Sequence, residues 1–577
     1  MKKIFSLALC LMMVLAMAAP VFAADPTYTL TINNATKDHT YEAYQIFSGK
    51  LEDVPNTNPV VQVLTDIEWG ASVTNGTELL AAIVAAANAE DAPAPLKTLA
   101  GAKDAANLAE LISDNITSDS ESLDALAEIF GSFLKTSPIA ESSYVAASGE
   151  VPAHYTINNL SAGYYLVKDK DDSLNNVYDS YTKFILRVIK NENVTPKSAV
   201  PSVDKEISDQ LADNYGEVKD FDINDSAYYK WTGHLPSNLS DYETYHYKFY
   251  DTLPKGIQHV KFEQIYLVDK DNNTVRTWMD LHDSDEDNNV LPAGITQTVT
   301  PNADGTTLIT LEFADLIALY PDILADQKIV VKYSAFITRD AVMAEPMTNS
   351  VYVEYDNDPN GTGEGHYGKT PEDVAHAFTF GVNVDKYDAD NKSTKLPGAE
   401  FVLYYTKAEK NEQTGETENV NYYAKVITKA FLDANPGYEI NDRPITEADR
   451  GVVYGWTKVR DEASTLTTNE NGQIMLRGLD AGIYYLQETK APAGYNLMET
   501  PVKVEIAPAY DKDGKMTSVE YKVDDIKQES NTVGVRNSSG STLPVTGGIG
   551  TTMFYVFGGA MVAVAVVLLV TKKRMAA

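Results

Sequence analysis

Three reactive side chains lie where strand alternation places core residues. Lys386, Glu488 and Asn537 each continue an apolar stripe, because side chains two residues apart in a strand share a face. The stripes are Phe378, Phe380, Val382 and Val384 before the lysine, Tyr484 and Leu486 before the glutamate, and Val533 and Val535 before the asparagine. The sequence therefore predicts an amine, a carboxyl and a primary amide in one core.

The same three residue types recur earlier in the chain, as Lys205, Asp251 and Asn349. Their neighbours on each strand face are Val203 and Ile207 for the lysine, Tyr245, Tyr247, Phe249 and Leu253 for the aspartate, and Val351, Val353 and Tyr355 for the asparagine. A second core is thus predicted to hold one lysine, one acid and one asparagine.

Buried together, these groups can react. An uncompensated charge in a core costs several kcal/mol, and burial lowers the pKa of a lysine and raises that of a carboxyl group. A neutral amine can attack the amide carbon, while a protonated acid polarises the carbonyl and moves protons as ammonia leaves. The alternative is that the lysines reach solvent from strand ends and the asparagines lie in turns. Recurrence of the trio favours an intramolecular isopeptide bond in each core.

The C-terminus carries an ordered set of three signals. The pentapeptide Leu543, Pro544, Val545, Thr546 and Gly547 precedes an apolar run over residues 552–570, and Lys572-Lys573-Arg574 follows. The run is about 30 Å long as a helix, enough to cross a bilayer, and the basic residues would stay in the cytoplasm. The set resembles a Gram-positive sorting signal, which implies that a sortase cuts between Thr546 and Gly547.

The N-terminal residues also indicate that the protein is exported. Lys2-Lys3, an apolar stretch and small residues near Ala23 are typical of a secretory signal peptide over residues 1–23. The only cysteine, Cys10, lies inside it, so we expect no disulfide and no cysteine metal site in the mature chain.

Composition excludes some classes of partner. The 577 residues carry a formal net charge of −35, which argues against nucleic acid or an anionic membrane as a partner. The acidic segment Asp283–Asp287 resembles the start of a calcium loop, but Asn288 replaces the expected glycine and Gly294 the expected glutamate. We expect a solvated loop there, with no metal and no cofactor in the protein.

The sequence predicts many short strands separated by turn residues. This pattern favours an all-β, multidomain chain of tandem immunoglobulin-like β-sandwiches. The first domain is expected over residues 24–195, with a helical insertion in which Leu123, Leu126, Phe130 and Phe133 mark one buried helix face. A linker follows at 194–201, then domains over 201–375 and 376–540, and the sorting signal over 543–577.

The two reactive domains resemble known families. Residues 384–386, 396–401 and 484–495 resemble a Cna-B-type domain of Gram-positive pilins, with Glu488 in the pilin E-box. That resemblance implies a bond between Lys386 and Asn537, catalysed by Glu488. Residues 251–256, DTLPKG, together with Asn349, resemble a Cna-A-type isopeptide-forming fimbrial domain, which implies a Lys205–Asn349 bond catalysed by Asp251.

The first domain departs from this pattern. Asn34 stands where a lysine is expected, and Lys168 stands where an acid is expected. We therefore predict no isopeptide bond there, although Asp169, Asn191 and Asn193 keep the alternative open.

A linker lysine completes the resemblance. Residues 194–197, VTPK, resemble the pilin motif, in which an exposed lysine at a domain junction accepts the sortase product. The resemblance is to the major, or backbone, pilin of Gram-positive sortase-assembled pili. It implies a structural protein of the cell wall and pilus rather than a turnover enzyme. In such a pilus Thr546 of one copy would be joined to Lys197 of the next.

The partners implied are pilus-type and housekeeping sortases, further copies of the chain joined head to tail, tip and basal accessory pilins, and peptidoglycan. The alternative is a wall-anchored adhesin or accessory pilin that is not polymerised.

Overall fold

The computed structural model describes residues 26–55, 61–90, 92–116, 121–149, 151–171, 173–174, 178–196, 199–281, 291–359, 366–411 and 415–540. The predicted signal peptide, Lys197, the segment Asp283–Asp287 and the sorting signal with Thr546 lie outside these ranges. Within them, no helix is both long and apolar enough to span a bilayer. The chain divides into two compact units, one of residues 1–217, 228–335 and 348–375, the other of residues 218–227, 336–347 and 376–577.

Two sheets form the first sandwich. One contains β5 (Ser143–Val145), β6 (His154–Leu160), β1 (Tyr28–Ile32) and β9 (Glu192–Val194) in that order. The other contains β3 (Gln62–Trp69), β2 (Tyr41–Asp53), β7 (Gly163–Asp169) and β8 (Lys183–Val188), with β4 (Ala140–Glu141) paired to β2. Leu30 and Ile157 from the first sheet pack with Tyr165 and Val167 from the second in one buried cluster.

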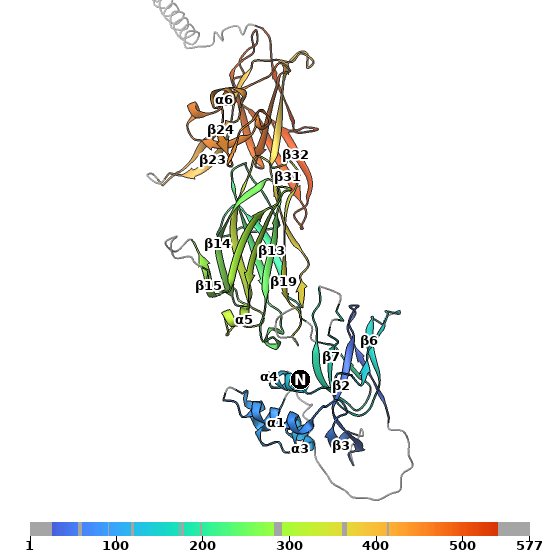
Figure 1. Cartoon of the computed structure of the whole chain (residues 1–577). Coiled ribbons are helices and arrows are strands. Elements are labelled where there is room, and N and C mark those ends of the chain that lie inside the picture. Colours follow the sequence, from blue (N-terminus) through green and yellow to red (C-terminus); the bar gives the residue numbers. More distant parts are fainter. Residues whose placement is uncertain are drawn as a thin grey trace, which may run out of the picture. The chain divides into compact units, whose positions relative to one another are not determined.

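Helices cover the other face of the β2 sheet. They are α1 (Gly76–Ala87), α2 (Ala94–Lys97), the 3-10 turn η1 (Thr98–Gly101), α3 (Ala105–Asn115) and α4 (Glu121–Ser132). Figure 1 shows α1, α3 and α4 gathered on one side of β2 and β3. Asn75 and Asp104 accept hydrogen bonds from the first free backbone N–H groups of α1 and α3, which explains where these helices begin. The predicted helical insertion is confirmed, with Leu126 and Phe130 of α4 buried.

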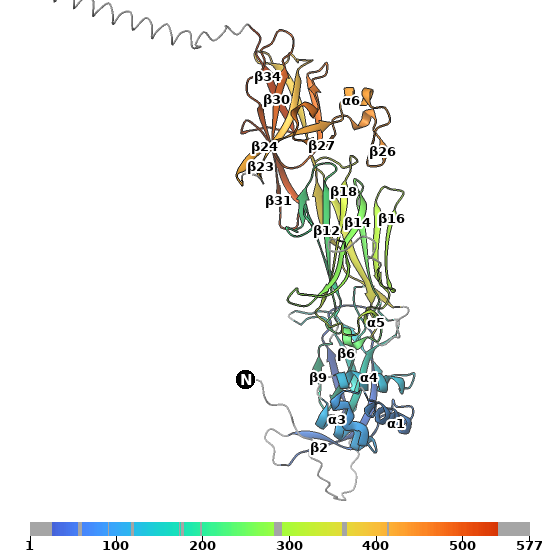
Figure 2. The ribbon, with the colours of Figure 1, turned by 90° about the vertical axis from the view of Figure 1, so that its left-hand side faces the viewer.

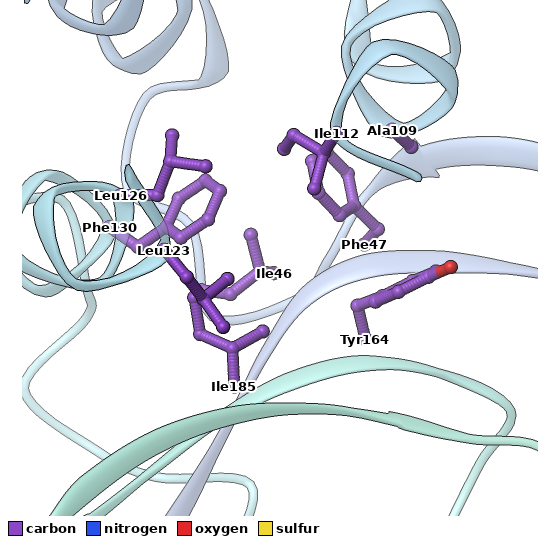
Figure 3. Close-up of a pocket in the computed structure, with 9 residues that line it drawn as sticks. All are labelled: Ile46, Phe47, Ala109, Ile112, Leu123, Leu126, Phe130, Tyr164 and Ile185. Atoms are coloured by element: carbon purple, nitrogen blue, oxygen red, sulfur yellow. The ribbon is translucent and has the colours of Figure 1, made fainter. Parts of the chain in front are cut away.

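The helices and the sheet enclose a small apolar void. Figure 3 shows Leu126 and Phe130 of α4 and Ile112 of α3 turned toward Phe47 and Tyr164 of the sheet. Its volume is about 20 Å³, close to that of one water, and its lining is almost wholly apolar. Such a space offers a water no polar partners, so it is a packing gap rather than a binding site.

The second sandwich pairs a five-stranded sheet with a larger one. The first contains β10 (Ser202–Ser208), β12 (Ser226–His234), β18 (Lys328–Ile337), β14 (Ile257–Val268) and β15 (Thr274–Asp280); Figure 2 shows β12, β18 and β14 side by side. The second contains β11 (Val218–Asp220), β21 (Asp373–Phe378), β19 (Met347–Asp356), β13 (Tyr247–Leu253), β17 (Thr307–Phe313) and β16 (Ile295–Pro301), with β20 (Tyr367–Lys369) on β19. Trp231 of the first stacks on Phe249 of the second, with ring centroids 5.2 Å apart. A short helix, α5 (Leu316–Leu319), follows β17.

The third sandwich packs a three-stranded sheet on an eight-stranded one. The small sheet contains β29 (Gln473–Leu479), β22 (Phe380–Asp388) and β34 (Thr532–Asn537). The large sheet contains β27 (Val453–Thr457), β24 (Thr417–Val426), β23 (Glu400–Lys410), β30 (Gly482–Lys490), β31 (Val502–Tyr510), β32 (Met516–Val523) and β33 (Ile526–Lys527), with β28 (Leu466–Thr467) on β23. The remaining elements are α6 (Lys429–Ala434) and the pair β25 (Glu439–Ile440) and β26 (Arg443–Pro444). One buried cluster joins Val384 and Val535 of the small sheet to Phe401 and Leu486 of the large one.

The predicted fold class is confirmed: the described chain is built mainly of β-sheets, with helices concentrated in the first domain. Leu30 and Ile32 of β1 are buried, and β18 is buried along nearly its whole length.

Candidate functional site

The small sheet of the third sandwich brings Lys386 and Asn537 together. They lie on β22 and β34, which are parallel neighbours, and Lys386 is in register with Val535. Asn537 is two residues further along β34, so it shares a face with Val535 and points into the same core. Glu488 lies on β30 of the facing sheet. Three strands thus deliver the three side chains to one place in the core.

Direct contacts join all three side chains. The Nζ atom of Lys386 donates a hydrogen bond to Oδ1 of Asn537 and lies 3.3 Å from Oε1 of Glu488. The amide nitrogen of Asn537 donates to both oxygens of Glu488 at 3.0 Å. Glu488 is held in turn by the backbone N–H of Met498, at 2.8 Å. The nucleophile therefore lies at the carbonyl, and the acid lies at the nitrogen that would leave.

Burial prepares this lysine to react. The exposed fractions of Lys386, Glu488 and Asn537 are 0, 4 and 2%. Loss of water lowers the pKa of Lys386 to about 8, against the attraction of Glu488. At pH 7 about a tenth of such amines is neutral, roughly 300 times more than at the ordinary lysine pKa. The geometry and the pKa both suit attack by an amine on an amide.

The second cluster lies between the two sheets of the second sandwich. Lys205, Trp231 and Tyr333 come from β10, β12 and β18 of one sheet. Asp251 and Asn349 come from β13 and β19 of the other. Asp251 is in register with Val351, and Asn349, two residues before Val351 on β19, lies on the same face.

Asp251 is the centre of this cluster. Its Oδ2 atom accepts hydrogen bonds from Nζ of Lys205, from Nε1 of Trp231 at 2.7 Å and from the hydroxyl of Tyr333 at 3.0 Å. The Tyr333 oxygen accepts a hydrogen bond from Nδ2 of Asn349 at 2.6 Å. Among the described residues, Oδ1 of Asp251 and Oδ1 of Asn349 are buried without a hydrogen-bond partner. These two unpaired acceptor oxygens favour a protonated Asp251, because its Oδ1 atom would then become a hydrogen-bond donor.

The electrostatics of the second cluster favour neutral partners. Lys205, Asp251 and Asn349 are completely buried. Burial lowers the pKa of Lys205 and raises the pKa of Asp251, while the attraction between the two groups acts in the opposite direction. Rings of Tyr229, Trp231 and Tyr333 lie 5.1–5.7 Å from the Lys205 Nζ atom and exclude water from it. A neutral amine beside a neutral carboxyl is the state that isopeptide formation requires.

Sequence reasoning missed two members of this cluster. The alternation that buries Ile329 and Val331 also buries Tyr333 on β18, so its burial was predictable. The hydrogen bond between Tyr333 and Asn349 was not predictable, because Asn349 lies on a strand of the opposite sheet. The hydrogen bond from Trp231 to Asp251 crosses between the sheets in the same way.

The first sandwich arranges its polar residues differently. Asn34 donates to the Tyr41 hydroxyl at 2.9 Å, and Lys168 pairs with Asp171 at 2.7 Å. Asn191 accepts from the Thr29 backbone at 2.9 Å, and Asn193 lies on β9 opposite Thr31. None of these contacts brings together a lysine, an acid and an asparagine among the described residues.

The core of the first sandwich contains a buried histidine cluster instead. No strand pattern in the sequence predicted this cluster. His39 lies between β1 and β2, with Nδ1 2.8 Å from Oδ1 of Asp169 and Nε2 3.0 Å from Oδ2 of Asp179. Tyr41 stacks on the imidazole ring, and Tyr155 meets it edge-on. Burial alone would lower the pKa of His39, but the two aspartates raise it to about 9. His39 is therefore an imidazolium held between two carboxylates.

This cluster predicts a loss of stability at alkaline pH. The folded pKa of His39 is about 9 and lies above the ordinary value of 6.5, so the stabilisation is complete below pH 6.5 and disappears as the pH rises through about 9. The difference between these two pKa values of His39 corresponds to about 3 kcal/mol of stability. In calorimetry at pH 6 to 10, the first-sandwich transition of wild type should fall, whereas His39→Gln should lie lower at pH 6 and change little. His154→Gln, at a more exposed histidine of β6, is the control and should follow wild type. An unchanged wild-type transition at pH 10 would contradict the assignment.

Two family models match the C-terminal part of the chain. Residues 439–524 match the SpaA prealbumin-like fold domain, and residues 536–576 match the LPXTG cell wall anchor motif. The protein is a cell-wall-anchored surface protein. The anchor match covers residues 543–576 of the predicted sorting signal, and the SpaA match contains Glu488 in the large sheet of this anchored protein. No curated protein sequence matches the chain.

Solved structures that resemble the anchored protein are themselves pilins. The T6 backbone pilin of serotype M6 Streptococcus pyogenes is 14% identical, with 90% of this chain and 100% of that chain covered and a TM-score of 0.44. The full-length major pilin SpaD from Corynebacterium diphtheriae is 16% identical, with 91% and 100% covered and a TM-score of 0.43. The major pilin SpaA of the same species is 12% identical, with 89% and 100% covered and a TM-score of 0.39.

Proposed function

We propose that the chain is the shaft subunit of a covalent, sortase-assembled pilus, and that isopeptide bonds Lys205–Asn349 and Lys386–Asn537 close its second and third sandwiches. The observation that carries the proposal is the recurrence of one buried constellation, a lysine, an acid and an asparagine, in two sandwiches of different topology. Chance burial of six such side chains in two matching groups would be costly, since each needs compensation in a core.

The contacts support one course of reaction in both cores. The neutral lysine Nζ attacks Cγ of the asparagine, and the carbonyl electrons move onto Oδ1. Glu488 or Asp251 takes a proton from Nζ, and the acid's own proton passes on to Nδ2. The Cγ–Nδ2 bond then breaks and ammonia leaves, so an amide and an amine become a new amide plus ammonia with no change in oxidation state. Each acid acts once per chain, which is why we regard the protein as structural rather than as a turnover enzyme.

The two bonds would strengthen their sandwiches in different ways. Lys205 and Asn349 come from strands of opposite sheets, so their bond would tie the sheets face to face. Lys386 and Asn537 come from neighbouring parallel strands and are 151 residues apart along the chain, so their bond would tie the ends of the sandwich within one sheet. Applied to such a closure, the loop-entropy model for disulfides gives about 5 kcal/mol.

Polymerisation would use the two ends of the chain. A sortase cysteine would attack the Thr546 carbonyl and release Gly547 and the residues after it, and the amine of Lys197 on another copy would then displace the enzyme. One donor and one acceptor at separate places on each copy give an open head-to-tail fibre. Housekeeping sortase would join the last copy to peptidoglycan, and accessory pilins would occupy the tip and base. The anchor match over residues 536–576 supports the donor end of this scheme.

Intact mass tests the internal bonds directly. Each bond removes one ammonia, so the folded chain should be lighter than its sequence mass by about 34 Da for two bonds. Lys205→Met and Lys386→Met should each form only one of the two bonds. The mass of each variant should therefore lie only about 17 Da below the mass of its own sequence. Lys332→Met is the control: this lysine, on β18, donates instead to the backbone oxygen of Leu211 at 3.0 Å, so the full deficit should remain. A wild-type chain at its full sequence mass would refute both bonds.

A further inference from the structure

One hydroxyl lies on the path between the acid and the amide in the second cluster. The Tyr333 oxygen is 2.6 Å from Nδ2 of Asn349 and 3.0 Å from Oδ2 of Asp251, and Nζ of Lys205 lies 3.5 Å away. In the third cluster the acid needs no such intermediary, because Glu488 accepts directly from Nδ2 of Asn537. Of the two clusters, only the second places a side chain between its acid and the nitrogen that leaves.

We propose that Tyr333 is a catalytic residue of the second sandwich, whose hydroxyl carries the proton from Asp251 to the departing nitrogen of Asn349. The inference rests on the proposed Lys205–Asn349 bond. It divides the two cores into two kinds: direct proton transfer by Glu488 in the third sandwich, and transfer through a phenol in the second.

The proton balance closes through three transfers. As the Nζ–Cγ bond forms, Lys205 gives one proton to Oδ2 of Asp251. Asp251 gives a proton to the Tyr333 oxygen, and Tyr333 gives its own to Nδ2, which by then is a tetrahedral amine with a free electron pair. The Cγ–Nδ2 bond breaks, and ammonia departs. Asp251 and Tyr333 return to their starting states, and one proton has moved from the amine to the leaving group.

The surroundings of Tyr333 suit a relay rather than a charged base. The side chain is completely buried, and its ring stacks on Tyr229 with centroids 5.1 Å apart, which fixes the hydroxyl in place. Burial and the nearby Asp251 raise the pKa of Tyr333, so the group stays a neutral phenol. A neutral phenol can accept and donate at the same time, as its hydrogen bonds with Asn349 and Asp251 show.

The test compares the two bonds within one chain. The full chain is pulse-labelled in a host without sortase, sampled over time and digested, and the 205–349 and 386–537 cross-linked peptides are quantified by mass spectrometry. Tyr333→Phe should slow the first bond about 100-fold, in the range of general acid–base catalysis, and leave the second at its wild-type rate. Tyr247→Phe is the matched control: this tyrosine lies on β13 and, among the described residues, its buried hydroxyl has no hydrogen-bond partner.

A conservative variant separates proton transfer from packing. 3-Fluorotyrosine placed at position 333 keeps the ring and the hydroxyl, so it should restore the 205–349 bond to within about threefold of wild type. Equal rates for wild type and Tyr333→Phe would overturn the inference while leaving the proposed bonds intact. So would 3-fluorotyrosine behaving like phenylalanine, and this variant decides the matter if Tyr333→Phe fails to fold. A wild-type chain without the 205–349 peptide would instead overturn the proposed bond itself.

Discussion

Glu488→Gln is expected to leave Lys386 and Asn537 unjoined and to destabilise the third sandwich severely. Glutamine cannot take up the lysine proton, so the mass deficit should fall from about 34 Da to about 17 Da. The lost closure is worth about 5 kcal/mol, and the buried Lys386 would also lose its carboxylate, which costs about 3–5 kcal/mol. Together these approach the whole stability of an ordinary domain. Calorimetry should place the third-sandwich transition at least about 20 °C lower.

Two further variants separate the bond from the charge. Asn537→Ala removes the amide but keeps the 3.3 Å approach between Lys386 and Glu488, so it should cost only the closure term. Glu505→Gln, on the same large sheet, removes a partly exposed pair with Lys522 and should change the unfolding free energy by less than about 1 kcal/mol. If Glu488→Gln retained the full mass deficit, the catalytic role of this carboxyl would be wrong.

Lys197→Ala is expected to abolish polymerisation altogether. If Lys197 is the amine that resolves the enzyme-bound Thr546, its loss leaves the fibre without an acceptor on every subunit. Cell-wall extracts run on denaturing gels should then lose the whole ladder of high-mass species. The monomer should remain on the wall, because peptidoglycan supplies its own amine to the housekeeping sortase.

Lys190→Ala is the matched control for this experiment. Lys190 is an exposed lysine seven residues earlier, after β8, and its removal should leave the ladder unchanged. If the ladder were kept in Lys197→Ala and lost in Lys190→Ala, Lys190 would be the acceptor amine instead of Lys197. A wild-type protein that forms no ladder in its own host would favour the unpolymerised adhesin or accessory pilin.

Much of both clusters could be predicted because strand alternation is a strict rule. Lys386 and Asn537 follow valines at two-residue spacing, and the structure buries all of these side chains. The same rule placed Lys205, Asp251 and Asn349 toward a core. A period of two fixes the face of a residue without any knowledge of which strand lies beside it.

The rest could not be predicted, because it depends on which sheets face one another. Alternation does not distinguish Lys205 and Asn349, on opposite sheets, from Lys386 and Asn537, on neighbouring strands. It also gives no partner for Tyr333. His39 is harder still: it lies in a connection, where no period applies, and its two aspartates are 130 and 140 residues away. Contacts of such separation are decided by tertiary packing rather than by local sequence.

The parallel pairing of β22 with β34 has a consequence for damage. Lys386 lies near the start of the third sandwich and Asn537 near its end, on strands that lie side by side. Once joined, they enclose residues 387–536 in a covalent ring. A protease that cuts anywhere in this ring opens it without parting the chain, because the ends stay connected through the side chains. A pilus built from such subunits would keep its length even if the third domain of each subunit were cut once.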